Sequence, residues 1–288
     1  MNLRNCCCLL FATLACTLQA QGPLDGYLKG KGVLDLAPSF SYNTADRFDG
    51  PSNQTYDLPY HGSMLALFAE YGLSRKTDLV ATAAYVFTEN KSGLQDGGLF
   101  VKYRPCYKDI GNGGKLGILL GGGLAFPLSD YEPLVTGALG QKAVSAPLRV
   151  IAQWETALGL FFNTTAGYTW RLDRLQDDDV AAIRAQRPDY EPVQPQNFTT
   201  LLFKAGFPAA HYYFDAWVEW QHSAGGADYQ PGVPDLPQAY GVSYTQAGGT
   251  LYYSENGKNG FYLSGAKIFG GRNTSRLLRM TAGMVFRF

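Results

Sequence analysis

The chain has 288 residues, of which 46% are hydrophobic and 14% aromatic, and its 24 basic side chains equal its 24 acidic ones. This balance excludes the strongly basic surface typical of nucleic-acid-binding proteins, so no nucleic-acid partner is expected. The mature part has no stretch of ~20 apolar residues, which excludes a helical membrane protein. Many Tyr, Phe and Gly residues favour an all-β chain.

The first residues have the pattern of a secretory signal peptide. Arg4 supplies a positive charge, the apolar stretch CCCLLFATLAC follows, and LQA ending at Ala20 fits a cleavage site. We expect residues 1–20 to be removed, residues 21–31 to form an N-terminal periplasmic segment, and residues 32–288 to form the main domain. The alternative is a lipoprotein with its lipid on Cys16, although TLAC lacks the aliphatic residue usual three positions earlier. Cleavage leaves only Cys106, so no disulfide is expected within the mature chain.

Twelve segments of about ten residues alternate between apolar and polar positions, which is the period of a β-strand. Short turns and long polar loops alternate between these segments. All short turns therefore fall at one end of the strands, and most long loops fall at the other. This pattern predicts a closed antiparallel transmembrane β-barrel of 12 strands, with short periplasmic turns and long extracellular loops. The expected strands are 32–42, 60–72, 79–88, 98–106, 116–127, 148–161, 166–173, 198–207, 212–223, 240–254, 261–269 and a last strand ending at Phe288. The stretch NTT at 163–165 is expected to be a turn.

Charged residues in these strands share the face opposite the large apolar residues. A charge facing hydrocarbon would be costly, so we expect the charged face to line a water-filled lumen. These residues could form a path for polar solutes, or they could pair across strands and simply fill a narrow interior; the mixed signs indicate no ion preference. The predicted lumen-lining set is Glu70, Lys102, Arg104, Arg149, Glu155, Arg171, Asp173, Lys204, Asp215, Glu219, Arg279 and Arg287.

The chain ends in TAGMVFRF, which alternates up to its last residue. Thr281, Gly283, Phe286 and Phe288 resemble the C-terminal sorting signal of outer-membrane barrels. The resemblance implies that the barrel assembly machinery and outer-membrane lipid are partners of the chain.

Several motifs resemble those of the outer-membrane proteins grouped as the putative meta-pathway of phenol degradation family. The motifs are Glu70–Leu73, Gly93–Asp96, Lys102–Arg104 and Phe126–Pro127, and the opening GYLKGKG (Gly26–Gly32) is similar to a Bacteroidetes-like branch. The chain departs from the family pattern at Leu128 and Ser129, where Thr-Gly is usual. The resemblance implies a barrel that takes up small hydrophobic or aromatic molecules.

Three other features allow two interpretations each. His61 and Ser63 have the spacing of a His-x-Ser pair on one strand face, which could serve a lipid hydrolase or only form part of the interfacial belt. The run Asp177–Asp179 could bind Ca²⁺ or begin a short helix, whose dipole favours acids there. The apolar loop 132–147 could fold into the pore or form a lid.

Together these patterns predict a passive channel for small molecules, of hydrophobic or aromatic character, in the outer membrane of a Gram-negative bacterium. No enzymatic activity, metal or cofactor is expected, and the solute is not specified. The alternatives are a plugged structural or surface-interaction barrel and, more remotely, a membrane-embedded lipid hydrolase.

Overall fold

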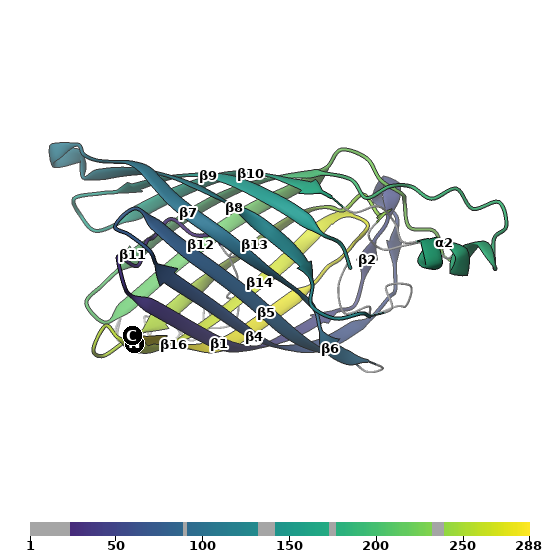
Figure 1. The fold of residues 1–288 in the computed structure, drawn as a ribbon, viewed down its shortest axis with the longest axis horizontal. Helices are drawn as coiled ribbons and strands as arrows, with labels where there is room; N and C mark the ends of the chain where they lie inside the picture. Colours follow the sequence, from purple (N-terminus) through teal and green to yellow (C-terminus); the bar gives the residue numbers. More distant parts are fainter. Residues whose placement is uncertain (1–23, 89–90, 132–141, 173–176, 232–238) are drawn as a thin grey trace, which may run out of the picture.

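A computed structural model describes residues 24–88, 91–131, 142–172, 177–231 and 239–288. Its main sheet closes on itself as an antiparallel barrel of twelve long strands, with the short β6 (Ser92–Leu94) as an extra strand on β5 (Figure 1). The long strands are β1 (Leu34–Ala45), β4 (Tyr60–Gly72), β5 (Thr77–Thr88), β7 (Asp96–Asp109), β8 (Lys115–Pro127), β9 (Ser145–Glu155), β10 (Phe161–Arg171), β11 (Phe198–Pro208), β12 (Tyr212–Ser223), β13 (Ser243–Tyr253), β14 (Asn259–Arg272) and β16 (Leu278–Arg287).

The barrel is an up-and-down meander in which each strand pairs with the next along the chain, and β1 pairs with β16 to close it. The backbone N–H of Phe288 donates to Leu34 and that of Leu34 to Phe288, so the last residue belongs to the closure. Five short turns lie at one end with the C-terminus, and the longer connections lie at the other, where α2 projects (Figure 1). The predicted fold class and the sorting of connections are therefore confirmed.

The strand period divides the side chains between the two faces of the wall. Large apolar residues point outward and are exposed, for example Leu65, Leu99 and Phe214. Their neighbours Glu70 and Asp215 point inward and are buried. An apolar exterior around a polar interior is the arrangement that a bilayer requires of a barrel.

One predicted strand pair has different boundaries in the structure. The strand expected at 148–161 ends at Glu155, and the turn lies at residues 156–160, where Gly159 has φ +83°. The expected turn at 163–165 is wrong, because Asn163 and Thr165 are buried inward-facing residues of β10. The boundaries differ for two reasons. The turn sequence TALGL is apolar and so has the composition of a strand, whereas the polar residues 163–165, which face the lumen, have the composition of a turn.

Small elements cover the end with the long connections. Strands β2 (Phe48–Asp49), β3 (Thr55–Tyr56) and β15 (Thr274–Ser275) form a three-stranded sheet there. The 3-10 helix η1 (Pro51–Asn53) lies between β2 and β3, whereas η2 (Gly111–Gly113) lies in the short turn after β7. The only α-helix of the described residues, α2 (Asp177–Arg184), is not long enough to cross a membrane.

The acidic run lies at the start of helix α2, so the expected helix start is confirmed. Asp177, Asp178 and Asp179 form its first turn, where their negative charges interact favourably with the positive end of the helix dipole. Its Val180 and Ile183 pack on residues of the neighbouring loops. Within the described residues, no group of three or more His, Cys, Asp or Glu side chains could hold a metal ion. Most of the loop 132–147, including residues 132–141, lies outside the described residues.

Candidate functional site

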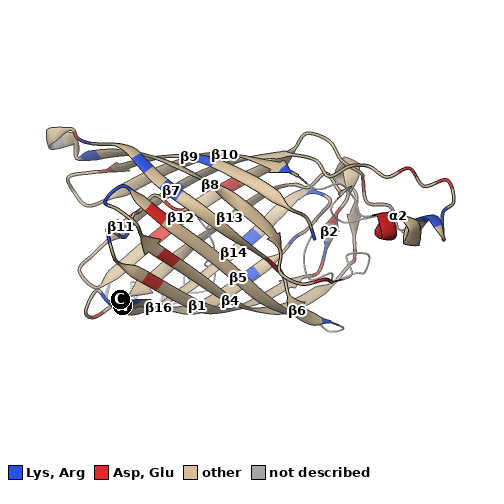
Figure 2. Ribbon diagram, in the orientation of Figure 1, with Lys and Arg blue, Asp and Glu red and all other residues tan. Residues whose placement is uncertain are grey.

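The barrel interior is the candidate site, because its inward face carries the buried polar residues of the wall. These residues include Asp35, Ser41, Asn43, Glu70, Asp78, Lys102, Gln153, Asn163, Lys204, Asp215, Glu219, Ser264 and Thr281. Charged positions on the strands are scattered around the wall, and acidic ones on β1, β4 and β5 gather near the short-turn end (Figure 2). Such a lining suits water and polar contacts and would not form a dry core.

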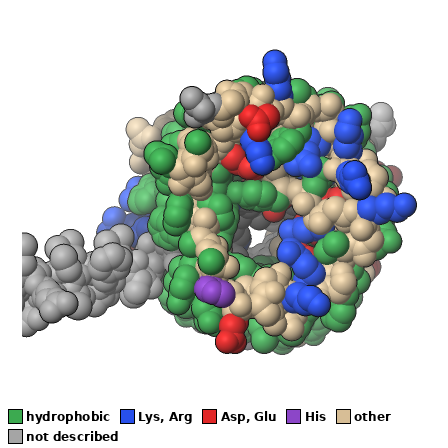
Figure 3. All heavy atoms as spheres, turned by 90° about the vertical axis from the view of Figure 1, so that its left-hand side faces the viewer, with side chains coloured by type: hydrophobic (Ala, Val, Ile, Leu, Met, Phe, Trp, Pro, Cys, Tyr) green, Lys and Arg blue, Asp and Glu red, His purple; other side chains and the backbone are tan. Residues whose placement is uncertain are grey.

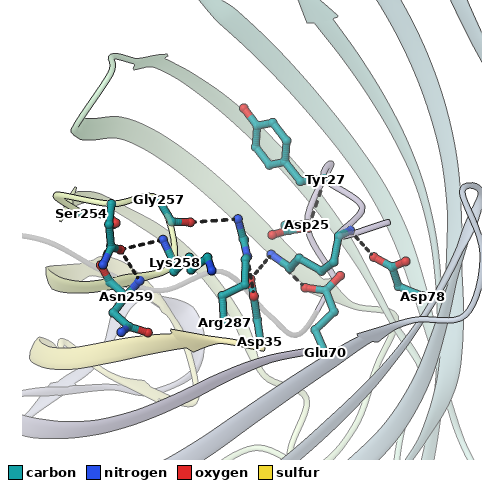
Figure 4. A network of polar contacts seen from close by, with 12 residues as sticks. Asp25, Tyr27, Asp35, Glu70, Asp78, Ser254, Gly257, Lys258, Asn259 and Arg287 are labelled. Carbon is teal, nitrogen blue, oxygen red and sulfur yellow. Dashed lines mark hydrogen bonds and ion pairs between the residues drawn. The ribbon is translucent and has the colours of Figure 1, made fainter. Parts of the chain in front are cut away.

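A segment at the N-terminus enters this interior from the short-turn end. We name residues 24–31 the lumenal segment. Its Leu24 is buried against Val80, Phe100, Leu119 and Ile151, which face inward from four neighbouring strands of the wall. This segment forms most of the expected N-terminal periplasmic segment 21–31, and it lies within the short-turn end of the barrel (Figure 4).

Lys102 on β7 is the centre of the polar contacts of this segment. Its ammonium group lies 2.7 Å from the Asp25 carboxylate and donates to the Tyr27 carbonyl at 2.5 Å. It also forms an ion pair with Glu70 on β4. Both Lys102 and Glu70 have fully buried side chains, so their charges depend on one another and on Asp25.

Lys29 makes the second attachment of the segment to the wall. Its ammonium group lies 3.2 Å from Glu70 and 3.3 Å from Asp35, and its backbone N–H donates to Asp78 at 2.7 Å. Asp35 also accepts from Arg287 at 2.7 Å. Figure 4 shows these wall carboxylates converging on the segment. Thus two lysines and one arginine are matched by four carboxylates, and the segment is held by charge as well as by packing.

Aromatic contacts continue the attachment toward the centre of the barrel. The Tyr27 ring meets Phe161 edge-on at 5.7 Å and lies 6.4 Å from Tyr213. Behind it, Lys204 forms an ion pair with Asp215 at 2.5 Å, and the Tyr213 hydroxyl donates to the same carboxylate at 2.7 Å. In the space-filling view onto the short-turn end, side chains crowd the interior and leave a narrow central opening (Figure 3).

The half of the interior nearer the long loops has a different polar lining. Glu219 accepts from the Tyr244 hydroxyl at 3.1 Å and from the Gln246 amide at 2.7 Å. Arg279 donates through Nε to Asn43 at 2.7 Å. Here hydrogen bonds replace the ion pairs of the short-turn end.

Loop residues at the mouth form a rim above this lining. Asp228 accepts from Arg272 at 2.7 Å and Asp49 accepts from Arg276 at 3.0 Å. The hydrogen bond from Arg272, with help from Asn273, lowers the pKa of Asp228 despite partial burial. Tyr229 contacts the rings of Phe48, Tyr56 and Tyr240 at 4.9, 5.2 and 6.3 Å, which gives the mouth an aromatic surface.

The predicted lumen residues fall into four zones. Glu70, Lys102 and Arg287 contact the lumenal segment or its partners, whereas Lys204, Asp215, Glu219, Arg149 and Arg279 lie farther along the interior. Glu155 accepts from Tyr107 at 3.2 Å, and the Arg104 guanidinium lies 4.4 Å from the Tyr107 ring, so both lie at the short-turn rim. Arg171 lies 5.3 Å from the Phe198 ring at the opposite rim. Asp173 lies outside the described residues.

Strand parity could have found two residues that the predicted set omits, Asp35 and Asp78. Asp35 has the inward parity of the first expected strand, and Asp78 directly precedes the third, at 79–88, with the same inward parity. The roles of Asp25, Tyr27 and Lys29 had no such signal, because their segment has no strand alternation and its partners are distant in sequence.

Comparisons with known proteins connect this geometry to a class of folds. No protein-family model matches the chain, and no curated protein matches it in sequence. Among solved structures, the COG4313 outer membrane channel from Pseudomonas putida F1 is similar over 93% of this chain and 100% of its own, with TM-score 0.68 and 12% identity. The NanC porin is similar over 87% of this chain and 98% of its own, with TM-score 0.56 and 13% identity. The chain shares the β-barrel fold of these outer-membrane proteins.

The His61 of the His-x-Ser pair makes polar contacts with the neighbouring strand. His61 Nδ1 lies 3.0 Å from the Thr44 hydroxyl and 3.3 Å from that of Tyr42, both on the neighbouring strand β1. These contacts engage the nitrogen in a polar belt on the outer face of the barrel. That arrangement is ordinary for a residue near a membrane interface.

Proposed function

We propose that the protein is a passive channel for small molecules in the outer membrane of a Gram-negative bacterium. The observation that carries the proposal is the closed wall, which is apolar outside and polar inside. This wall matches the bilayer on one face and water on the other. The fold shared with the COG4313 channel and the NanC porin supports the same class of function.

The solute class is proposed from the resemblance to the meta-pathway of phenol degradation group, including its Bacteroidetes-like opening. The motifs Glu70–Leu73 and Lys102–Arg104 lie on β4 and β7 and include the Glu70 and Lys102 of the charge network. The aromatic mouth around Tyr229 provides an apolar surface at the long-loop end. Small hydrophobic or aromatic compounds therefore suit this channel.

Single-channel recording tests the proposed function. The mature protein, without residues 1–20, would be refolded and inserted into a planar bilayer, and solute uptake would be followed by liposome swelling. Discrete, reproducible openings and swelling with small solutes are expected. A heat-modifiable, folded barrel that gives neither result would overturn the channel function.

A plugged structural or surface-interaction barrel is the second candidate, and the lumenal segment is the observation that favours it. Its contacts with Lys102, Glu70 and Asp78 fill part of the short-turn end. This candidate requires that the segment block all conduction. Zero conductance of the mature barrel, restored by removing the segment, would favour it over the open channel.

We also propose that the barrel assembly machinery reads the C-terminal residues Thr281, Gly283, Phe286 and Phe288. Phe288→Ala is expected to reduce the folded protein in outer-membrane fractions by ~10-fold, because the backbone closure with Leu34 remains while the terminal ring is lost. Phe288→Tyr retains the ring and serves as control. Heat-modifiable mobility on gels would measure the folded fraction, and refolding of the Ala variant in detergent should stay normal. Equal amounts of all three forms in the membrane would contradict the proposal.

We propose no enzymatic activity for the chain. His61 Nδ1 contacts the hydroxyls of Thr44 and Tyr42. The purified barrel and its Ser63→Ala variant are expected to show the same background phospholipid hydrolysis. Hydrolysis by the parent protein that disappears in the variant would establish the hydrolase instead.

A further inference from the structure

Two arginines of the interior have no carboxylate partner, unlike the lysines nearer the short-turn end. Lys102, Lys29 and Lys204 each pair with at least one carboxylate. Arg279 has only the Asn43 amide as a hydrogen-bond acceptor, and among the residues that the structure describes neither Arg279 nor Arg149 forms an ion pair. Guanidinium groups held in a partly enclosed space without a counter-charge favour an anion.

Arg149 on β9 and Arg279 on β16 both interact with one inward-facing residue, Tyr244, although they lie on different strands. Arg149 on β9 is the cross-strand partner of Gly167, and a Cβ on Gly167 would lie 3.3 Å from the Arg149 stem. Tyr244 lies close enough to both Arg149 and Arg279 to interact with them electrostatically. Glu219, a carboxylate that contacts the same Tyr244, accepts hydrogen bonds from Tyr244 and Gln246.

A buried donor without an acceptor, Trp217, lies in the next layer toward the short-turn end. Trp217 is only 4% exposed, and its indole Nε1 has no hydrogen-bond partner among the described residues. It packs with Leu202 and Ala266, and Ala266 is the cross-strand partner of Arg279. A buried donor without an acceptor is costly, and because the nitrogen itself is buried, Trp217 meets the lumen through its ring.

We propose that Arg149, Arg279 and Trp217 form a subsite for a small organic carboxylate with an apolar body, which deepens the channel function proposed above. The guanidinium groups bind the carboxylate, for which their fork geometry is suited. Leu202 and the Trp217 ring lie beside the apolar part. The aromatic mouth around Tyr229 lies at the long-loop end and suits the same amphipathic solute. The subsite makes the channel selective for anions of this kind.

Fluorescence of Trp217 tests the subsite independently of conduction. The chain has four tryptophans, and Trp154, Trp170 and Trp220 lie on the exposed outer face. Replacing these three by Phe leaves Trp217 as the reporter in the refolded full-length mature protein. Sodium benzoate is expected to change its emission saturably, whereas neutral benzyl alcohol and cationic benzylamine are expected to bind at least ~10-fold more weakly.

Arginine variants supply the decisive comparison. Arg149→Gln and Arg279→Gln are each expected to weaken benzoate binding by about tenfold, and the corresponding Lys variants should recover part of the affinity. Arg47→Gln removes an equal charge from an exposed position beyond β1 and should leave the Kd unchanged. Heat-modifiable mobility would verify that each variant folds, which is expected because neither arginine has an ion pair to lose.

Three results would overturn the subsite: equal affinity for benzoate and benzyl alcohol, an unchanged benzoate Kd in both Gln variants, or no saturable change in any folded form. Failure of the channel function gives a different result. Benzoate binding that depends on the arginines in a barrel without conductance would sustain the subsite and reject passive transport.

Discussion

Removing the lumenal segment is expected to raise the single-channel conductance of the barrel by ~2-fold or more, because current depends on the open cross-section of the lumen. Deletion of residues 24–31 takes away Leu24, Asp25, Tyr27 and Lys29, which lie against the wall at the short-turn end. The wall retains the Lys102–Glu70 and Arg287–Asp35 pairs, so the barrel should still fold. Planar-bilayer recording and liposome swelling would measure the change.

A point substitution tests the same effect without shortening the chain. A Cβ on Gly26 would lie 1.9 Å from Oε1 of Gln153 and 2.6 Å from Nδ2 of Asn163, so Gly26→Leu must displace both buried side chains and is expected to weaken docking of the segment. Lys31→Ala, at the exposed end of the segment, is the matched control and should conduct like the parent. If the deletion and Gly26→Leu both conduct like the parent, the segment does not limit flow, and the constriction lies toward the long loops.

The barrel itself could be predicted because its signal is local and repeated. In β4, Leu65 and Leu67 point outward while Glu70 points inward, as alternation predicts. The period of two holds along the regular parts of the strands because one face must meet hydrocarbon and the other must not. This rule fails where the strand is irregular. The register shift between Tyr103 and Cys106 on β7 means that parity alone does not place Arg104.

The turn wrongly predicted at 163–165 results from the polar inward face of the wall, the same feature that made the strands predictable. In a soluble sheet, Asn and Thr near a strand end favour a turn. In this barrel, Asn163 donates its amide to Gln153 and accepts from Thr165, so these polar residues belong to the lining. A polar interior therefore removes the contrast in polarity on which turn prediction depends.

The attachment of the lumenal segment could not be predicted because its contacts are made across the barrel. Asp25 reaches Lys102 over a separation of 77 residues, and Lys29 reaches Asp78 over 49. No short pattern encodes such partners. The candidate site was thus predicted as a set of inward charges, but which charges are matched and which are not depends on the three-dimensional closure.

Lys102→Met is expected to destabilise the folded barrel by about 3 kcal/mol or more, the largest stability effect that we expect from one substitution in the wall. The Lys102 and Glu70 side chains are fully buried, and Asp25 shares the same ammonium group. Without the Lys102 ammonium group, the Asp25 and Glu70 carboxylates would lose their shared partner. Lys29, which forms an ion pair with Glu70, would be the nearby cation that remains. Denaturant unfolding in detergent micelles, followed by tryptophan fluorescence, would measure the loss.

Two further variants separate the charge from the rest of the side chain. Lys108→Met, on the exposed end of the same strand, should unfold with the parent midpoint. Adding Glu70→Gln to Lys102→Met should recover part of the stability, because it removes one of the carboxylates left without its partner. A Lys102→Met barrel as stable as the parent would mean that lumen water solvates these charges fully. In that case packing of Leu24 and Tyr27, and not the ion pairs, would hold the segment in place.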